Sequence, residues 1–486
     1  MNEMTRYFRT GLGPWQLAVY ITVGVAVAAL IFFLPIQYFI VAAAGSFVLA
    51  VIASRPEIGV LIITVLVSSI VFEDSMPLIP IGIGSLHIAD ILLFFMTAAV
   101  VCKRLTGRTE NFAATPLTLP LLLFYGVVLF SAYISITHHG KNFNDVIRIL
   151  RYVTYYFLFF IVTNEIDEKR RIVFLVKGML LIGGVVAATM VAQAMIGDSV
   201  QLMPGRIEAA ETFGEEYGAL RILPPGQTLL FISFITAMCI TVFRLGRSAV
   251  FSGMSALVIL LGGAIVLTYN RSYWVAIMLT TGFLMFLAGA EQRKRLTVLV
   301  ATVAVGAGLL TAFCIYSGTG SKTMEAVSER FDSIFAGKTL AESSSLDDRA
   351  IENGYAVSQI TSHPVLGIGL GNDYRPERAG LDDKLTYYVH NVYLWIMADT
   401  GLLGFLLFAW FYLLFLIRAA RNWRRIQDNF LKSVVFGFML SGVAMLPMAM
   451  VIPVFMEWFS IVAIATMMGL TDTIIRNYGT ENETAR

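Results

Sequence analysis

A histidine and an asparagine stand directly before a long apolar run late in the chain. His390 and Asn391 precede VYLWIMADTGLLGFLLF, and a polar loop joins them to HPVLGIGLGN at residues 363–372. Because imidazole exchanges protons near neutral pH, His390 is the candidate base, and Asn391 is a candidate substrate ligand. As a helix N-terminal residue, His390 would be kept neutral by the helix dipole. The alternative is a structural histidine that caps the helix.

Arg271 is the only charged residue between Arg247 and Glu291. As one helix this stretch would be about 60 Å long, twice the thickness of a bilayer core, so it must fold as a hairpin. Both flanks are basic, which puts the apex, residues 269–274, at the opposite membrane surface. There Arg271 is either an anion ligand or an interfacial arginine among the aromatic residues of the membrane belt.

Other arginines are predicted to gather at the same surface. Arg148 and Arg151 are one helical turn apart, and Arg206 and Arg221 precede a later apolar run. Arg349 lies in DDRAIENGYAVSQI, which predicts an amphipathic surface helix. Arginine binds phosphate oxygens through paired N–H groups and stays charged at physiological pH. Each arginine alone is equally typical of a solvated residue, but together they predict a basic cavity for a diphosphate.

The composition predicts an all-α, polytopic integral membrane protein. Of 486 residues, 57% are hydrophobic and 14% are charged, far more apolar sequence than one soluble core can bury. At roughly 20 residues a span, about 12–14 transmembrane helices are expected. The net charge of +2 indicates no nucleic-acid partner, and the three cysteines lie in apolar runs without a CxxC motif.

Basic clusters in alternate connections divide the chain into four predicted regions. By the positive-inside rule these clusters face the cytoplasm, which places both termini there. Residues 317–388 then form a large extracytoplasmic loop, in which seven Lys/Arg face eleven Asp/Glu. The regions are the N-terminal transmembrane helices (1–200), the central helices with the arginine hairpin (201–316), this loop (317–388), and the C-terminal helices with a cytoplasmic tail (389–486).

Several motifs together resemble the O-antigen ligase and O-unit polymerase superfamily of membrane glycosyltransferases. They are Asn270-Arg271-Ser272, HPVLGIGLGN, His390-Asn391-Val392-Tyr393-Leu394 and Asp399-Thr400-Gly401-Leu402-Leu403-Gly404, within residues 205–420. The resemblance implies a GT-C-like helical fold in the bacterial inner membrane, with the active site on the periplasmic face. It implies a glycan donor on undecaprenyl diphosphate and a glycan or lipid acceptor. Other polysaccharide-assembly proteins are expected as partners besides the lipid bilayer.

By position, the resemblance also assigns roles to residues. Arg221 and Arg271 would bind the diphosphate and stabilise the leaving group, and His390 would deprotonate the acceptor hydroxyl. Arg349, Arg148, Arg151 and Asn391 are the predicted substrate-binding residues. No cofactor or metal is expected, because the arginines would replace a divalent cation. Polymerase and ligase share this chemistry and both stay open, and a lipid-linked oligosaccharide transporter (flippase) is the alternative, since it too needs a basic cavity.

Overall fold

The computed structural model describes residues 36–68, 70–72, 79–80, 85–106, 112–212, 215–243, 253–316, 327–328, 331–332, 344–377 and 385–479. The chain divides into two units, Met1–Arg55 and Pro56–Arg486. In the first unit the described element is α2 (Ile36–Ser54). The second unit contains everything discussed below.

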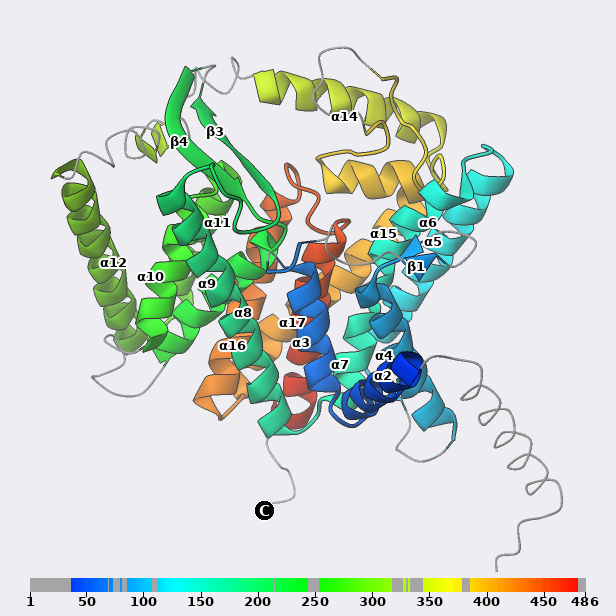
Figure 1. The fold of residues 1–486 in the computed structure, drawn as a ribbon, viewed down its shortest axis with the longest axis horizontal. Coiled ribbons are helices and arrows are strands. Elements are labelled where there is room, and N and C mark those ends of the chain that lie inside the picture. Colours follow the sequence, from blue (N-terminus) through cyan, green and yellow to red (C-terminus); the bar gives the residue numbers. More distant parts are fainter. Residues whose placement is uncertain are drawn as a thin grey trace, which may run out of the picture. The chain divides into compact units, whose positions relative to one another are not determined.

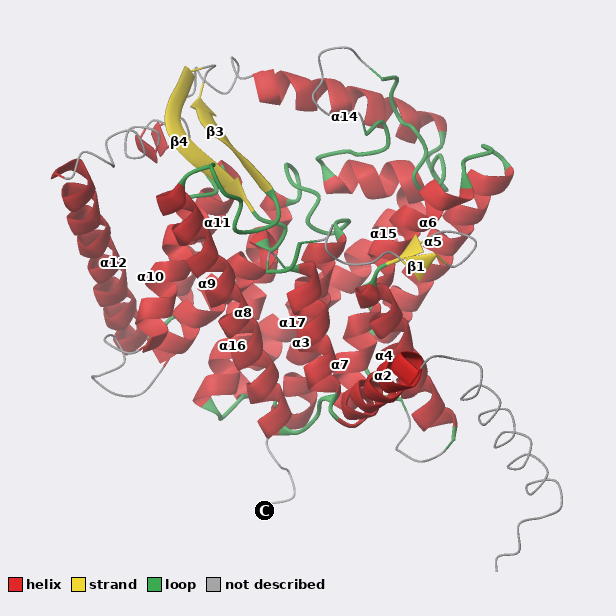
Figure 2. Cartoon of the chain, in the orientation of Figure 1, coloured by secondary structure: helices red, strands yellow, loops and turns green. Residues whose placement is uncertain are grey.

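Helices dominate the described part of the second unit (Figure 2). They are α3 (Pro56–Val67), α4 (Ile88–Leu105), α5 (Thr118–Thr137), α6 (Phe143–Thr154), α7 (Phe157–Glu165), α8 (Lys169–Ile196), α9 (Gln227–Phe243), α10 (Gly253–Val266), α11 (Arg271–Leu287), α12 (Ala290–Tyr316), α14 (Ser344–Ser362), α15 (Val392–Asn422), the short 3₁₀ turn η3 (Trp423–Arg425), α16 (Asn429–Met448) and α17 (Trp458–Tyr478). The strands form two antiparallel pairs, β1 (Ile79–Pro80) with β2 (Ser85–Leu86) and β3 (Arg206–Thr212) with β4 (Glu215–Leu223). The predicted all-α class is confirmed.

Within the described residues, six helical stretches are long and apolar enough to cross a membrane. They are Thr118–Thr137, Phe143–Glu165, Lys169–Ile196, Val392–Arg425, Asn429–Met448 and Trp458–Tyr478. The expected 12–14 spans exceed this number partly because α9, α10 and α11 are apolar but shorter than a full span. The first predicted span lies outside the described residues.

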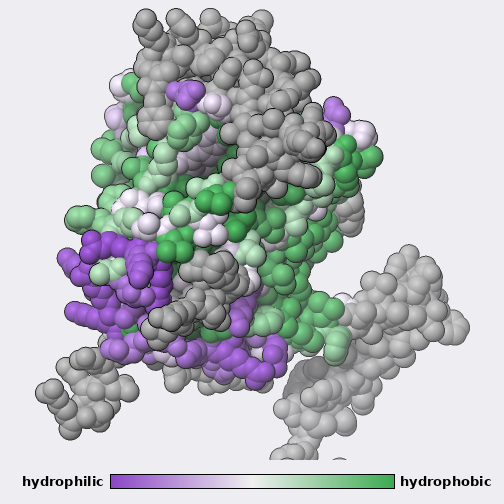
Figure 3. Space-filling view, turned by 90° about the vertical axis from the view of Figure 1, so that its left-hand side faces the viewer, coloured by the Kyte–Doolittle hydropathy of each residue, from purple (hydrophilic) through white to green (hydrophobic). Residues whose placement is uncertain are grey.

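The spans differ in how far they are buried by the rest of the protein. In α17, 94% of the apolar window is buried, whereas in α5 and α15 the share is 44%. α17 is therefore a central helix, and α5 and α15 expose apolar side chains as lipid-facing helices do. Figure 3 shows a broad hydrophobic band above a hydrophilic region on one face of the molecule. This arrangement fits a polytopic membrane protein.

The β3–β4 hairpin and α14 lie at the same end of the helices (Figure 1). α11 begins with Arg271 at its turn with α10, and the basic residues Arg293, Lys294 and Arg295 follow its other end. Residues 253–287 of the apolar stretch fold as the predicted helical hairpin, with the turn at residues 267–270. Arg271 is thus separated from this basic cluster by the whole length of α11.

Candidate active site

The β3–β4 hairpin positions Arg221 beside the turn between α10 and α11. In its register Glu208 pairs with Arg221, and their side chains form a salt bridge of 2.9 Å. Arg221 Nε donates to the carbonyl oxygen of Thr268 at 3.2 Å, and the neighbouring Ile222 N–H donates to that of Leu267 at 3.1 Å. The hairpin is therefore hydrogen-bonded to the turn that precedes Arg271. Arg206 and Arg221, which the sequence places only before an apolar run, therefore lie on paired strands.

The turn before Arg271 is packed inside the protein. Tyr269, which has a φ of 47°, is 1% exposed, and Tyr273 and Trp274 are 2% and 8% exposed. Ser272 Oγ donates to Asn270 Oδ1 at 2.6 Å, which stiffens the start of α11. Aromatic residues of a membrane belt face lipid headgroups, whereas these are buried by protein. The packing favours a ligand-binding arginine over one that merely anchors the helix.

Electrostatic effects connect four arginines: Arg206 and Arg349 act on Arg221, and Arg271 acts on Arg349. Burial lowers the pKa of Arg221, and the positive charges of Arg206 and Arg349 lower it further, while Glu208 raises it. Burial also lowers the pKa of Arg349, with a contribution from Arg271 in the same direction. We call Arg206, Arg221, Arg271 and Arg349 the arginine cluster. Like charges gathered in this way repel one another until an anion binds, and guanidinium groups suit phosphate oxygens.

α14 brings a carboxylate to His390. This helix, predicted from the amphipathic pattern around Arg349, packs against α15 and directs Arg349, Glu352 and Ala356 to one face. The Glu352 side chain is 4% exposed, and its Oε2 lies 2.8 Å from His390 Nδ1. The ring of Tyr388 packs edge-on against the imidazole, with 5.0 Å between ring centroids. Glu352, which contacts His390, is therefore one helical turn from Arg349 of the arginine cluster.

The start of α15 differs from the prediction. Its first helical residue is Val392, and Asn391 is the N-cap, so His390 precedes the helix instead of opening it. Asn391 Oδ1 accepts hydrogen bonds from the N–H groups of Tyr393 at 3.1 Å and Leu394 at 3.4 Å. The expectation that His390 is a helix N-terminal residue is wrong, because the shorter asparagine side chain is the better cap. The role of Asn391 in substrate binding stays a prediction.

The glycine-rich segment after α14 holds α15 in place. Gly401, with a φ of 68°, interrupts α15 and leaves backbone groups that the segment satisfies. Ile368 N–H donates to Ala398 O at 2.8 Å, and Leu402 N–H donates to Pro364 O at 2.9 Å. Positive φ angles at Gly367, Gly369 and Gly371 show that these glycines permit tight turns. The segment follows α14 and bonds to the backbone of α15, so it links the helix that carries Glu352 to the helix that His390 precedes.

Residues 256–409 match the family model described as O-antigen ligase. This part of the chain is therefore similar to the O-antigen ligase and polymerase superfamily. The match runs from α10 into α15 and includes Arg271, Arg349 and His390, whereas Arg221 lies before it. No curated protein matches the chain. The O-antigen ligase domain supports a glycosyltransferase activity of the ligase or polymerase type.

Arg148 and Arg151 on α6 make contacts away from the arginine cluster. Arg148 pairs with Asp145 on its own helix at 3.1 Å. Arg151 lies 3.6 Å from Asp90 of α4, and its guanidinium stacks over Trp458 of α17. The Arg151 contacts hold α6 against α4 and α17. Substrate binding by the two arginines stays a prediction.

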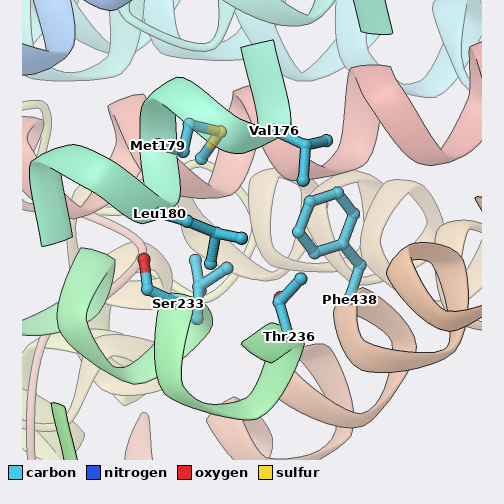
Figure 4. Close-up of a pocket in the computed structure, with 7 residues that line it drawn as sticks. Val176, Met179, Leu180, Ser233, Thr236 and Phe438 are labelled. Atoms are coloured by element: carbon cyan, nitrogen blue, oxygen red, sulfur yellow. The ribbon is translucent and has the colours of Figure 1, made fainter. Parts of the chain in front are cut away.

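A small cavity between α8, α9 and α16 is separate from the arginine cluster (Figure 4). Its lining has no charged residue and consists of Val176, Met179, Leu180, Ile232, Ser233, Thr236 and Phe438. The hydroxyls of Ser233 and Thr236 are buried and have no hydrogen-bond partner among the described residues. Such a place suits a water molecule better than a phosphate, which requires positive charge.

Two acidic residues complete the surroundings of His390. Glu352 is absent from the site that the sequence predicts, although its position one turn after Arg349 on an amphipathic helix is a usable signal. Glu457 precedes α17, and Tyr388 O–H donates to its Oε1 at 3.2 Å. Burial raises the pKa of Glu457 to about 7, although the Tyr388 bond and the charge of Arg206 act in the opposite direction. Glu457 therefore titrates near neutral pH next to the catalytic candidates.

The raised pKa of Glu457 predicts a pH-dependent stability. The folded protein disfavours the charged carboxylate, so stability falls as pH rises from the ordinary pKa of 4.5 through about 7. The change is on the order of 3 kcal/mol. We expect Glu457→Gln, which stays neutral, to melt at a higher temperature than the wild type at about pH 8 and at a similar temperature at about pH 5. Asp198→Asn removes an exposed acid as a control, and parallel melting curves for wild type and Glu457→Gln would contradict the prediction.

Proposed function

We propose that the protein is a metal-independent glycosyltransferase that transfers a glycan from undecaprenyl diphosphate to an acceptor hydroxyl in O-antigen or exopolysaccharide assembly. The observation that carries the proposal is the arginine cluster beside the His390–Glu352 pair. A diphosphate leaving group needs positive charge, and an acceptor hydroxyl needs a base. The O-antigen ligase domain supplies the reaction class.

The proposed reaction is a direct displacement with inversion at the anomeric carbon. Arg221 and Arg271 bind the diphosphate, with Arg349 beside them. His390 accepts the proton of the acceptor hydroxyl as its oxygen bonds to the anomeric carbon. The bond between that carbon and the phosphate oxygen breaks, and undecaprenyl diphosphate leaves with the electron pair. The arginines stabilise the negative charge that develops on it.

We place the site on the periplasmic face of the bacterial inner membrane, with both termini in the cytoplasm. The support is the separation along α11 between Arg271 and the basic residues 293–295, because basic clusters favour the cytoplasmic side. The same gathering of arginines at one end of the helices argues against a transporter. Alternating access requires charge along a path near the middle of the membrane.

The glycan profile of a deletion strain tests the function and separates polymerase from ligase. The strain is complemented with the wild type or with Arg271→Ala, and both glycan length and point of attachment are resolved. Single repeats in place of long chains would identify a polymerase. Long chains that remain on the polyprenyl carrier, with the final acceptor bare, would identify a ligase. An unchanged profile would contradict the proposed function.

Transfer by the purified protein is expected to withstand metal chelation. In the proposed mechanism the arginine cluster supplies the positive charge that a divalent cation supplies in metal-dependent transfer. We expect the rate in EDTA to stay within about twofold of the untreated rate. A rate that vanishes in EDTA and returns with Mg²⁺ or Mn²⁺ would show that the arginines do not suffice.

A further inference from the structure

The contact between Glu352 and His390 defines which imidazole nitrogen can accept a proton. A carboxylate accepts hydrogen bonds and donates none when ionised, so at 2.8 Å from Glu352 Oε2 the Nδ1 atom of His390 carries hydrogen. The neutral imidazole then has its lone pair on Nε2. Nε2 is therefore the atom that can take a proton from an acceptor hydroxyl.

Glu352 has both a charged neighbour and a hydrogen-bonding partner. Its carboxylate is almost completely buried, and it raises the pKa of Arg349, one turn earlier on the same face of α14. A buried carboxylate is stable when it has a charged partner and a hydrogen-bond donor, and here Arg349 and His390 supply them. Glu352 thus connects the arginine cluster to the histidine.

Tyr388 restricts the position of the His390 imidazole from another side. The Tyr388 ring packs edge-on against it, and the Tyr388 hydroxyl is fixed by its hydrogen bond to Glu457. The backbone oxygen of Tyr388 accepts a hydrogen bond from Tyr374 O–H at 3.0 Å. With Glu352 at Nδ1 and Tyr388 against the ring, both the tautomer and the orientation of His390 are determined.

We propose that Glu352 is the positioning residue of His390: it holds the Nδ1–H tautomer and stabilises the imidazolium that forms during glycosyl transfer. The inference rests on the proposed function and adds a second member to its proton-accepting group. Glu352 does not itself take up the proton. It remains ionised while the proton of the acceptor hydroxyl moves to Nε2.

The test is the pH profile of transfer by the purified full-length protein in lipid nanodiscs. The glycan donor is an undecaprenyl-diphosphate-linked oligosaccharide, and kcat and donor KM are measured between about pH 5 and about pH 9, where histidine titrates. For Glu352→Gln we expect kcat to fall by about 10²–10⁴-fold with little change in donor KM. The acidic limb of the profile should move to lower pH, because removal of the negative charge at Nδ1 takes away a contact that favours the imidazolium.

A matched control comes from the same helix. Asp348→Asn removes an equal charge one turn before Glu352, and we expect it to keep the wild-type pH profile. If Glu352→Gln does not fold, Glu352→Asp replaces it: the shorter carboxylate should reduce kcat by about tenfold at unchanged KM, and Asp348→Asn should not reproduce that loss. A rise in donor KM alone, in either Glu352 variant, would overturn the inference in favour of a structural role.

The experiments distinguish failure of the proposed role of Glu352 from failure of the proposed function. A wild-type protein that transfers glycan while Glu352→Gln keeps its kcat and pH limb would overturn the role of Glu352 and leave the proposed function intact. A wild-type protein that does not use the polyprenyl-diphosphate donor, and leaves the glycan profile of the deletion strain unchanged, would overturn the proposed function itself.

Discussion

Replacement of Arg271 by alanine is expected to reduce glycosyl transfer by about 10³-fold or more while the protein still accumulates in the membrane. The guanidinium lies at the start of α11, where the electrostatic effect on Arg349 places it in the arginine cluster. As the bond to phosphate breaks, negative charge develops on the diphosphate, and an arginine already in place stabilises it without reorganisation. The loss should appear mainly in kcat.

Lysine at this position is expected to restore little of the rate. Its ammonium keeps the charge but lacks the planar fork that binds two phosphate oxygens at once. Arg293→Ala, at the far end of α11, serves as the control because it removes an arginine outside the cluster. The variants are compared by immunoblot of the membrane fraction and by transfer rate. Equal rates for Arg271→Ala and Arg293→Ala would remove Arg271 from the mechanism.

Arg271 also shows what the sequence can predict about this site. Its isolation in an apolar stretch twice the length of a span implies a hairpin, which the structure has, although the turn lies at residues 267–270 and not at 269–274. The helix around Arg349 follows from an amphipathic pattern, and the glycine turns follow from composition. These features depend on residues close together in the chain, where periodicity and chain length carry the information.

The remaining contacts depend on tertiary packing. Glu352 and His390 are 38 residues apart, and nothing local to either residue indicates the other. The β3–β4 hairpin contains glycine and several charged residues, so its sequence is typical of a loop, and its docking on the turn before α11 stabilises the pairing. Arg148 and Arg151 share a helix face as predicted, yet Asp145 and Asp90 are their ion-pair partners. The four predicted regions of the chain stay a prediction.

Substitution of Gly401 by alanine is expected to destabilise the protein strongly, because both the backbone angles and the space at this position exclude a side chain. With φ at 68° and ψ at −174°, Gly401 occupies backbone space that costs other residues about 1–3 kcal/mol. An added Cβ would also lie 2.1 Å from the backbone oxygen of Val365, in the segment that satisfies the break in α15. Neither backbone can move without the loss of the hydrogen bonds that join them. We expect a large fall in melting temperature in detergent, together with loss of transfer, because His390 is positioned by this part of α15.

Two other glycines separate the contributions. Gly140 has a φ of 61° but open space around its Cβ position, so Gly140→Ala should show the backbone strain alone. Gly126 lies within α5, also with open space, and alanine there should be neutral or stabilising by about 0.5–1 kcal/mol. The expected order of melting temperatures is therefore Gly126→Ala highest, then Gly140→Ala, then Gly401→Ala. Suppose that Gly401→Ala has the same melting temperature as Gly140→Ala and keeps its activity. The backbone bonds between residues 363–372 and α15 then contribute little to stability, and the position of His390 must depend on α14 alone.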